Sequence, residues 1–249
     1  MARELISKNA TKSVYRDGDK AIKVFCKGFP KSEVLNEALI SARIEELGEI
    51  HIPATLAVSV EEDGCWSITK DYIDGKTLKQ LMVENPDQID KYLDQMSDLQ
   101  ILIHSKTCPL LNRLKDKMAR QITEITELNP TNRYDLLTRL DCTPKHTKLC
   151  HGDFQPDNII VRDDGTMYVL DWVHATQGNA SADVARTYLL FCLDNQDTAD
   201  KYMRLFCDKT GTDIRYVQQW LPLVAAAQLT KNRPEEAELL HNWLNVCDY

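Results

Sequence analysis

The chain has 249 residues, of which 43% are hydrophobic, and a formal net charge of −8. This length and composition suffice for one large or two small globular domains and argue against a largely disordered chain. Neither G-x-G-x-x-G nor G-x-x-x-x-G-K-[ST] occurs, which excludes the glycine-rich Rossmann and P-loop phosphate sites. The excess of acidic residues argues against binding to nucleic acid, which depends on Lys and Arg neutralising phosphates.

The eight cysteines and the absence of apolar runs predict a cytoplasmic protein. The cysteines form no C-x-x-C pair and are scattered through apolar stretches, which favours free thiols over a disulfide framework, although their even number permits one. The N-terminus lacks the apolar region of a signal peptide, and no apolar run approaches the ~20 residues of a membrane helix. We therefore expect no membrane partner.

Strand signals dominate the first 75 residues. Two Asp-Gly turns, each between β-rich segments, predict two hairpins, because Asp-Gly between such segments is the strongest short-range hairpin signal. The strands are expected at 11–16, 20–25, 56–60 and 65–69. One helix is expected between the hairpins, from about residue 30 to 47, where Pro30 and Ser32 mark its start.

After Gly75 the pattern becomes mostly helical. Helical periodicity predicts helices at about 77–84, 87–105, 110–128, 131–140, 182–194, 197–210, 213–231 and 234–246. A third Asp-Gly hairpin, with strands at 159–162 and 166–170, interrupts this region. The sequence thus predicts an α+β fold with a small β-rich lobe, residues 1–75, and a larger helical lobe, residues 76–249.

Three polar side chains cluster around the third hairpin. Asp153 and Asn158 lie in the loop before it, and Asp171 directly follows its second strand. Since hairpin strands lie ~4.8 Å apart, Asn158 and Asp171 become neighbours. An amide oxygen beside a carboxylate forms the hard oxygen ligand pair that Mg²⁺ accepts. With Asp153 nearby to take a hydroxyl proton, this set is the minimal apparatus for phosphoryl transfer.

Other polar residues of this region have simpler interpretations. Asp157, Asp163 and Asp164 are interpreted as turn formers whose side chains bond their own backbone. His151 is expected to support the loop through a hydrogen bond rather than to act as a ligand, and His174 has a weaker claim to any role.

The pattern His151-x-Asp153-x-x-x-x-Asn158, followed by Leu170-Asp171-Trp172, resembles the catalytic and metal-binding segments of the aminoglycoside phosphotransferase/choline kinase family. The resemblance implies a bilobal protein-kinase-like fold and a small-molecule kinase. Protein kinases have Arg where this chain has Gly152, and they carry an A-P-E segment that is missing here. Both differences favour the small-molecule branch.

The resemblance extends to the β-rich lobe and the interlobe connection. Ala21-Ile22-Lys23 resembles the segment of the nucleotide-binding lysine, with Glu37 as its ion-pair partner, although Glu33 lies on the same helical face. Strand alternation places Ala21 and Lys23 on one face, where Lys23 can meet the phosphates.

Two further segments complete the resemblance. Residues 71–75 are similar to the hinge whose backbone groups, here those of Asp71 and Ile73, would meet adenine. Asp183 resembles the family's downstream Asp that steadies the catalytic loop, and it could equally cap a helix.

The first hairpin departs from the protein-kinase pattern. Its loop at 8–13 contains no glycine, so phosphate contacts are left to Ser13, Thr11 or backbone N–H groups.

The predicted function is transfer of the γ-phosphoryl group of ATP, with Mg²⁺, to a hydroxyl of a small molecule. The tail at 171–249 has 11 acidic and 7 basic residues, and in the family it helps to wall the acceptor cleft, which favours a cationic or amine-bearing acceptor. A nucleotide-binding pseudokinase or regulatory module, and a protein-substrate kinase, are the alternatives. We expect a monomer or a weak homodimer.

Overall fold

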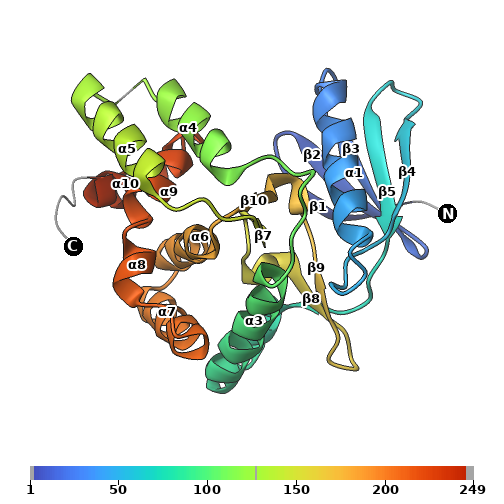
Figure 1. Cartoon of the computed structure of the whole chain (residues 1–249). Helices are drawn as coiled ribbons and strands as arrows, with labels where there is room; N and C mark the ends of the chain where they lie inside the picture. The colour runs from blue at the N-terminus through green and yellow to red at the C-terminus, as the bar shows by residue number, and fades with distance from the viewer. Residues whose placement is uncertain (1–2, 127, 245–249) are drawn as a thin grey trace. The chain divides into compact units, whose positions relative to one another are not determined.

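The computed structural model describes residues 3–126 and 128–244 (Figure 1). The chain divides into two compact units, one formed by Met1–Glu84 with Pro156–Val173 and the other by Asn85–Gln155 with His174–Tyr249. The chain passes between these units three times, so the lobes predicted at 1–75 and 76–249 remain a prediction. Within the described residues, no helix combines the length and apolar character needed to span a membrane.

The first unit contains a five-stranded antiparallel sheet. Its strands, in spatial order, are β1 (Glu4–Lys8), β2 (Lys12–Asp17), β3 (Lys20–Phe25), β5 (Trp66–Asp71) and β4 (Thr55–Val60). The two predicted hairpins are confirmed, with Gly18 and Gly64 in the left-handed conformation that their turns require. β1 was not predicted, because all five of its residues are exposed and show no apolar alternation.

Helix α1 (Lys31–Glu45) covers one face of this sheet. Its fully buried Val34 and its Ala38 pack against Phe25 of β3 and Ile68 of β5. The same face of α1 carries the buried Glu37, so packing of the apolar residues fixes the place of this carboxylate.

A second, three-stranded sheet holds the third predicted hairpin. Its strands are β6 (Lys76–Thr77), β8 (Ile159–Val161) and β9 (Met167–Val169), and helix α2 (Leu78–Glu84) follows β6 directly. Gly75 permits the close approach of β6 to β8, since a Cβ there would lie 2.4 Å from the Val161 carbonyl oxygen. The Leu170 N–H donates a hydrogen bond of 2.8 Å to the Asn158 carbonyl oxygen, so Asn158 and Asp171 are neighbours as expected.

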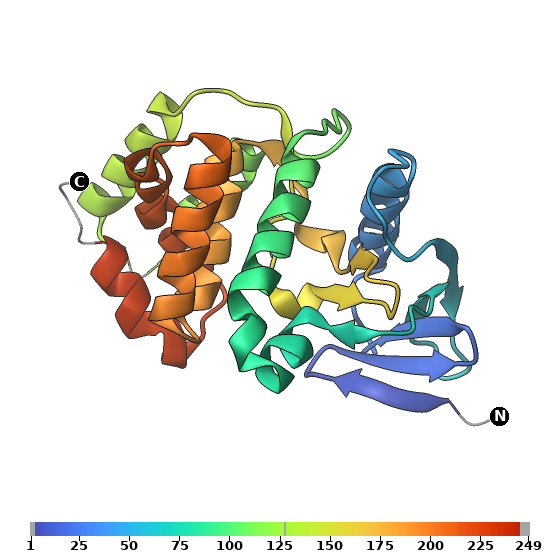
Figure 2. The same cartoon turned by 90° about the horizontal axis from the view of Figure 1, so that it is seen from below.

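Helices form most of the second unit, and α3, α6 and α7 lie side by side within it (Figure 2). The helices are α3 (Ile89–His104), α4 (Leu114–Glu124), α5 (Pro130–Cys142), α6 (Ala180–Cys192), α7 (Gln196–Thr210), α8 (Ile214–Gln218), α9 (Leu221–Leu229) and α10 (Ala237–Leu244). Two short strands, β7 (Lys148–Cys150) and β10 (Thr176–Gly178), pair with each other.

Three predicted helices differ from the observed ones. The helix predicted at 213–231 is divided into α8 and α9, because Pro222 has no N–H to donate and therefore occupies the first turn of a new helix. The helix predicted from residue 110 begins at Leu114, since Arg113 forms a β-bridge with Gln177. The helix predicted at 234–246 begins as a 3₁₀ turn, and its residues 245–246 lie outside the described residues.

Seven cysteines lie in the described residues, and all seven are free, which agrees with the expected free thiols. Cys247 lies outside the described residues.

We predict that the α1–sheet contact contributes strongly to the stability of the first unit. Val34→Ala removes two fully buried methyl groups and should lower the free energy of unfolding by about 2 kcal/mol. Leu35→Ala, at the next position of α1 but exposed, should change it by less than ~0.5 kcal/mol. Urea unfolding followed by tryptophan fluorescence tests this, because Trp66 packs on the same cluster. Equal losses in the two variants would contradict this account of the packing.

Candidate active site

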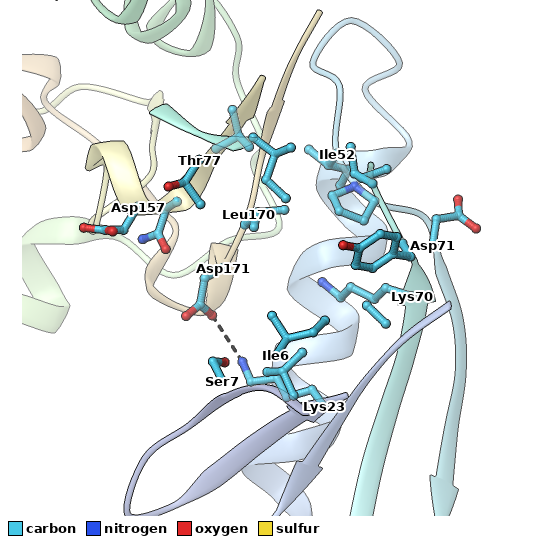
Figure 3. A pocket seen from close by; sticks show the side chains of 18 of the residues that line it. Ile6, Ser7, Lys23, Ile52, Lys70, Asp71, Thr77, Asp157, Leu170 and Asp171 are labelled. Carbon is cyan, nitrogen blue, oxygen red and sulfur yellow. Dashed lines mark hydrogen bonds and ion pairs between the residues drawn. The ribbon is translucent and has the colours of Figure 1, made fainter. Parts of the chain in front are cut away.

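A cavity of about 470 Å³ lies within the first unit (Figure 3). The five-stranded sheet contributes Lys12, Val14, Ala21, Lys23 and Lys70 to its wall, and α1 contributes Glu37. The end of β5 and the segment after it contribute residues 71–73, and the residues flanking the β8–β9 hairpin contribute Asn158 and Asp171. Most of the residues predicted for nucleotide and metal binding thus surround one cavity.

A buried lysine, Lys23, lies between two carboxylates in the wall of this cavity. The Lys23 ammonium lies 2.5 Å from Glu37 Oε1, and the Lys23 side chain is only 14% exposed. The ammonium also lies 3.2 Å from Asp171 Oδ1, the contact marked in Figure 3. Burial alone would lower the pKa of Lys23, but Asp171 and Glu37 outweigh burial and raise this pKa. Glu33, the other acidic residue considered for this pairing, is exposed.

Lys12 is a second cation at Asp171, and the sequence did not single it out. Its Nζ lies 3.1 Å from Asp171 Oδ2. Burial opposes the charge of Asp171, yet the two lysines outweigh burial and lower the pKa of this carboxyl well below its usual range. Asp171 itself, two residues after the end of β9, adopts a left-handed conformation with φ of 55°. The carboxylate is therefore ionised and held between two ammonium groups.

An asparagine takes the place of glycine in the first hairpin loop. Asn9 Oδ1 accepts hydrogen bonds from the N–H groups of Thr11, at 2.9 Å, and Lys12, at 3.0 Å. An Asn side chain that bonds the backbone two residues on stabilises a tight turn without glycine. Because both N–H groups already have this acceptor, they are not available to a phosphate, contrary to one of the contacts considered from the sequence.

Ser13 is not among the residues that line the cavity. In the β2–β3 register Val14 faces Lys23, whereas Ser13 faces Val24. Since side chains alternate between the two faces of a strand, Ser13 points away from the face of Lys12 and Val14. The expected contact of Ser13 with phosphate therefore has no support in this geometry, and Lys12 and Ser7 occupy the cavity wall instead.

The segment predicted as the hinge also lines this cavity, through Asp71, Tyr72 and Ile73. The N–H of Asp71 bonds the Ala54 carbonyl at 3.0 Å, and the N–H of Tyr72 bonds the Asp19 carbonyl at 2.8 Å, so this backbone is fixed by its neighbours. Within the described part of the chain, the Ile73 N–H donates to no acceptor. This group is therefore available to a ligand.

The oxygen donors at Asp171 suit a magnesium ion whose other ligands are phosphates and water. They do not form a complete set of protein ligands. Among the residues that the structure describes, no three His, Cys, Asp or Glu side chains converge on a common point. Mg²⁺ in kinases is held by one or two protein oxygens together with phosphates and water. One ionised carboxylate, Asp171, beside one amide, Asn158, matches this requirement.

The His-Gly-Asp segment lies in the second unit, where its backbone is held tightly. Gly152 has φ of +79°, and a Cβ there would lie 2.6 Å from the His174 carbonyl oxygen, so only glycine fits. The buried His151 accepts a hydrogen bond of 3.2 Å from the Asp153 N–H through Nδ1. The structure thus gives a physical reason for each of the first two residues of the segment.

Asp183, at the start of α6, accepts hydrogen bonds from this loop. Its carboxylate bonds the Gly152 N–H at 2.7 Å and the His151 N–H at 3.1 Å, and His104 Nε2 lies 2.9 Å away. Burial opposes the charged form of Asp183, but the hydrogen bond and charge of His104 outweigh burial and lower its pKa. The helix cap itself comes from Asn179, whose side chain accepts from the Ser181 N–H.

Asp153 faces cations that the sequence did not connect with it. Its Oδ1 lies 3.5 Å from Arg186 and 4.0 Å from Lys231, and its Oδ2 accepts from Gln155. Burial would raise the pKa of Asp153, yet Lys231 and Arg186 outweigh burial and lower it. The carboxylate is therefore in the charged form that can accept a proton.

Lys117 completes a group of three cations around Asp153. Burial, together with repulsion from Arg186 and Lys231, lowers the pKa of Lys117 to about 8. Burial and Arg186 likewise lower the pKa of Lys231 to about 8. Lys117 carried no sequence signal, and Arg186 lies three residues after Asp183, the residue that the resemblance identified.

Comparison with known proteins identifies the family. A model of the phosphotransferase enzyme family matches residues 3–220. The chain belongs to this family. The predicted family is thereby confirmed. No curated protein matches the chain significantly by sequence.

Solved structures of phosphotransferases share the fold. Aminoglycoside phosphotransferase APH(4)-Ia has a TM-score of 0.74 at 14% identity, with 98% of this chain and 92% of that chain covered. A thermostable mutant of that enzyme, in ternary complex with ADP and hygromycin B, has a TM-score of 0.73 at 13% identity, covering 98% and 92%. A GDP complex of aminoglycoside 2'-phosphotransferase-IIIa has a TM-score of 0.65 at 17% identity, covering 98% and 92%. The predicted α+β fold of protein-kinase type is confirmed.

The depressed pKa values of Lys117 and Lys231 predict that stability increases with pH. A lysine of the unfolded chain keeps a pKa near 10.5, whereas the folded values fall to about 8. Between these two pH values the unfolded chain binds more protons, so the free energy of unfolding rises as pH rises. Lys117→Met should flatten the slope of melting temperature against pH in this range.

Lys201→Met, at an exposed position of α7, is the matched control and should keep the slope of the wild type. Thermal unfolding at pH 7.5 to 10 measures both variants. A slope in Lys117→Met equal to that in the control would show that Lys117 is not destabilised by its neighbours.

Proposed function

We propose that this phosphotransferase is an ATP-dependent kinase that moves the γ-phosphoryl group of Mg-ATP to a hydroxyl of a small molecule. The observation that carries the proposal is the buried arrangement of Lys23 between Glu37 and Asp171 in a cavity of about 470 Å³. Phosphoryl transfer in kinases requires a lysine that binds the phosphates, a carboxylate that positions this lysine, and a second carboxylate that binds the metal. A lysine buried between two carboxylates meets this requirement. The nucleotide complexes of the solved neighbours agree with such a role for this cavity.

In this proposal the nucleotide lies along the wall of the cavity. Adenine would rest on Ala21, and the available Ile73 N–H and the Asp71 carbonyl would bond its edge. Lys23 would bind the phosphates while Glu37 holds its ammonium in place. Lys12, rather than Ser13, supplies a further positive charge at the same end of the cavity.

Asn158 and Asp171 would hold the magnesium ion. The ion would supply positive charge that offsets the negative charge developing on the phosphate oxygens. Lys12 and Lys23 occupy both carboxylate oxygens of Asp171 at present, and an ion bound there would compete with these contacts. In the absence of the ion, the two lysines keep Asp171 ionised.

Asp153 would act as the base. The acceptor hydroxyl oxygen forms a bond to the γ-phosphorus while the bond from that phosphorus to the β,γ-bridging oxygen breaks, so that ADP leaves. The hydroxyl proton passes to the Asp153 carboxylate. Asn158 comes five positions after Asp153, so the covalent chain keeps their Cα atoms within about 18 Å. His151 and Asp183 would hold the loop in the orientation that this step needs.

The alternatives make different demands on the same residues. A pseudokinase or regulatory module has no need of Lys23, Asp153, Asn158 and Asp171 together. The only sequence feature in its favour was the lack of glycine in the first hairpin loop, and Asn9 stabilises that loop without glycine. A protein-substrate kinase would phosphorylate polypeptides. Transfer from γ-labelled ATP to small-molecule pools or to protein extracts distinguishes the three. As before, we expect a cytoplasmic monomer or weak homodimer that binds no nucleic acid.

Asp153→Asn should retain nucleotide binding and lose most turnover. General-base assistance is worth about 10²–10⁴-fold in rate, so kcat should fall by at least two orders of magnitude. The control is Asp116→Asn, at an exposed position of α4. Release of ADP in a coupled assay measures turnover, and calorimetry measures nucleotide binding. Unchanged turnover would refute the assignment of Asp153 as the base.

Asp171→Ala should abolish the thermal stabilisation that Mg-ATP gives to the wild type. A ligand that binds only the folded state raises the free energy of unfolding by RT ln(1 + [L]/Kd), and the variant loses the carboxylate that would hold the ion. Asp163→Ala, in the exposed turn of the same hairpin, should keep the full shift. The measurement is the melting temperature with and without Mg-ATP. The assignment fails when Asp171→Ala and Asp163→Ala show the same shift.

A further inference from the structure

A second, smaller cavity lies in the second unit beside the His-Gly-Asp segment. It measures about 140 Å³, and Lys117, Gly152, His174, Arg186 and Lys231 contribute to its wall. Because Arg186 and Lys231 also contact the Asp153 carboxylate, the cavity opens next to the proposed base. It is therefore the place where an acceptor that presents its hydroxyl to Asp153 would put its neighbouring groups.

Among the described residues, only two of the three cations of this cavity lie within 4.0 Å of a carboxylate. Asp153 lies 3.5 Å from Arg186 and 4.0 Å from Lys231. Lys117 Nζ donates to the His174 carbonyl at 3.0 Å, and within the described residues no carboxylate lies within 4.0 Å of it. Arg186 also donates to the side chain of Gln228.

The other carboxylates near the cavity already have hydrogen-bond or ion-pair partners. Asp183 is occupied by His104 and by the N–H groups of residues 151 and 152. Glu236 accepts from Arg233 at 2.8 Å and from Gln228 at 2.5 Å. Lys117, Arg186 and Lys231 carry three positive charges against the two carboxylates of Asp153 and Asp183, so positive charge is in surplus in a cavity with a partly apolar wall.

Such an arrangement is unfavourable for folding by itself. Burying an ammonium group without a counter-ion is costly, and repulsion between neighbouring cations adds to this cost. The lowered pKa values of Lys117 and Lys231 express the same penalty. An anion in the cavity would remove the penalty by accepting charge-assisted hydrogen bonds from the three side chains.

We propose that this cavity binds an anionic group, a carboxylate or a phosphate, of the small hydroxyl-bearing acceptor. This inference rests on the proposed kinase function and specifies its substrate class. It reverses the expectation of a cationic or amine-bearing acceptor, which came from the acidic tail as a whole. The charge that decides recognition is the charge of the side chains in the cavity wall, and that charge is positive.

The dimensions of the cavity limit the size of the acceptor. Sites for drug-sized ligands measure about 300–1,000 Å³, and this cavity is smaller at about 140 Å³. Lys231 and Arg186 reach to within 4.0 Å of the Asp153 carboxylate, so the reacting hydroxyl and the anionic group are separated by only a few bonds. A short hydroxy acid or a small phosphorylated alcohol has this form.

Four small alcohols that differ in charge test the proposal. The probes are glycerate and glycerol 3-phosphate as anions, glycerol as the neutral compound and choline as the cation. Transfer of label from γ-labelled ATP gives kcat/KM for each, and calorimetry without ATP measures binding of the two anions. Comparison of the two anions distinguishes a carboxylate from a phosphate as the bound group.

The variants are Lys117→Gln and Lys231→Gln, and the matched control is Arg120→Gln, at an exposed position of α4 outside the cavity. We expect kcat/KM for at least one anion to exceed that for glycerol and choline by at least tenfold. Each lysine variant should lose at least tenfold of this value, mainly through KM, while the control stays within twofold of wild type. Lys231→Gln serves if Lys117→Gln does not fold.

Three results would overturn the inference. Choline or glycerol could be turned over as well as the anions, or the lysine variants could lose the same factor with every acceptor, which would assign the cations to the transferred phosphoryl group instead. The anions could also bind variants and wild type alike. Failure of the proposed function has a different signature: no acceptor is phosphorylated, while the anions still bind to wild type and Arg120→Gln and not to the lysine variants.

Discussion

Burial of Lys23 between Glu37 and Asp171 is the interaction on which the first unit depends. A buried ammonium group needs carboxylates around it, and each of the two comes from a different element, α1 or the end of β9. Apolar packing of α1 on the sheet brings Glu37 to the lysine, and hairpin pairing brings Asp171. The same contacts that compensate the buried charge therefore assemble the wall of the cavity.

The second unit also contains a buried charge, in this case the negative charge of a carboxylate. Asp183 is buried and ionised, and it is satisfied by His104 and by two backbone N–H groups of the His-Gly-Asp segment. If the loop moved away, the buried Asp183 carboxylate would lose these donors, and an unpaired buried charge is strongly unfavourable. The orientation of Asp153 thus follows from the desolvation of a residue thirty positions later in the chain.

Net charge and local charge point in different directions in this protein. The chain carries a net charge of −8, and its tail contributes much of the excess acid. Around Asp153, however, Lys117, Arg186 and Lys231 face one another within a small cavity. Coulomb interactions weaken with distance and are screened by solvent, so a few buried cations outweigh many exposed carboxylates in recognition of a small ligand.

The sequence by itself determined the features that depend on local patterning. Asp-Gly turns located three hairpins, and strand pairing made Asn158 and Asp171 neighbours, because turn chemistry and strand spacing are short-range. Packing between distant segments decided much of the rest, since Lys12 met Asp171 only where the five-stranded sheet faces the β8–β9 hairpin. The exposed β1 had no apolar pattern, and Pro222 divided a continuous helical pattern. Lys117 and Lys231, more than a hundred residues apart, met only in the tertiary structure. No local pattern encodes such a meeting, since it depends on how α4 and the segment after α9 pack around Arg186.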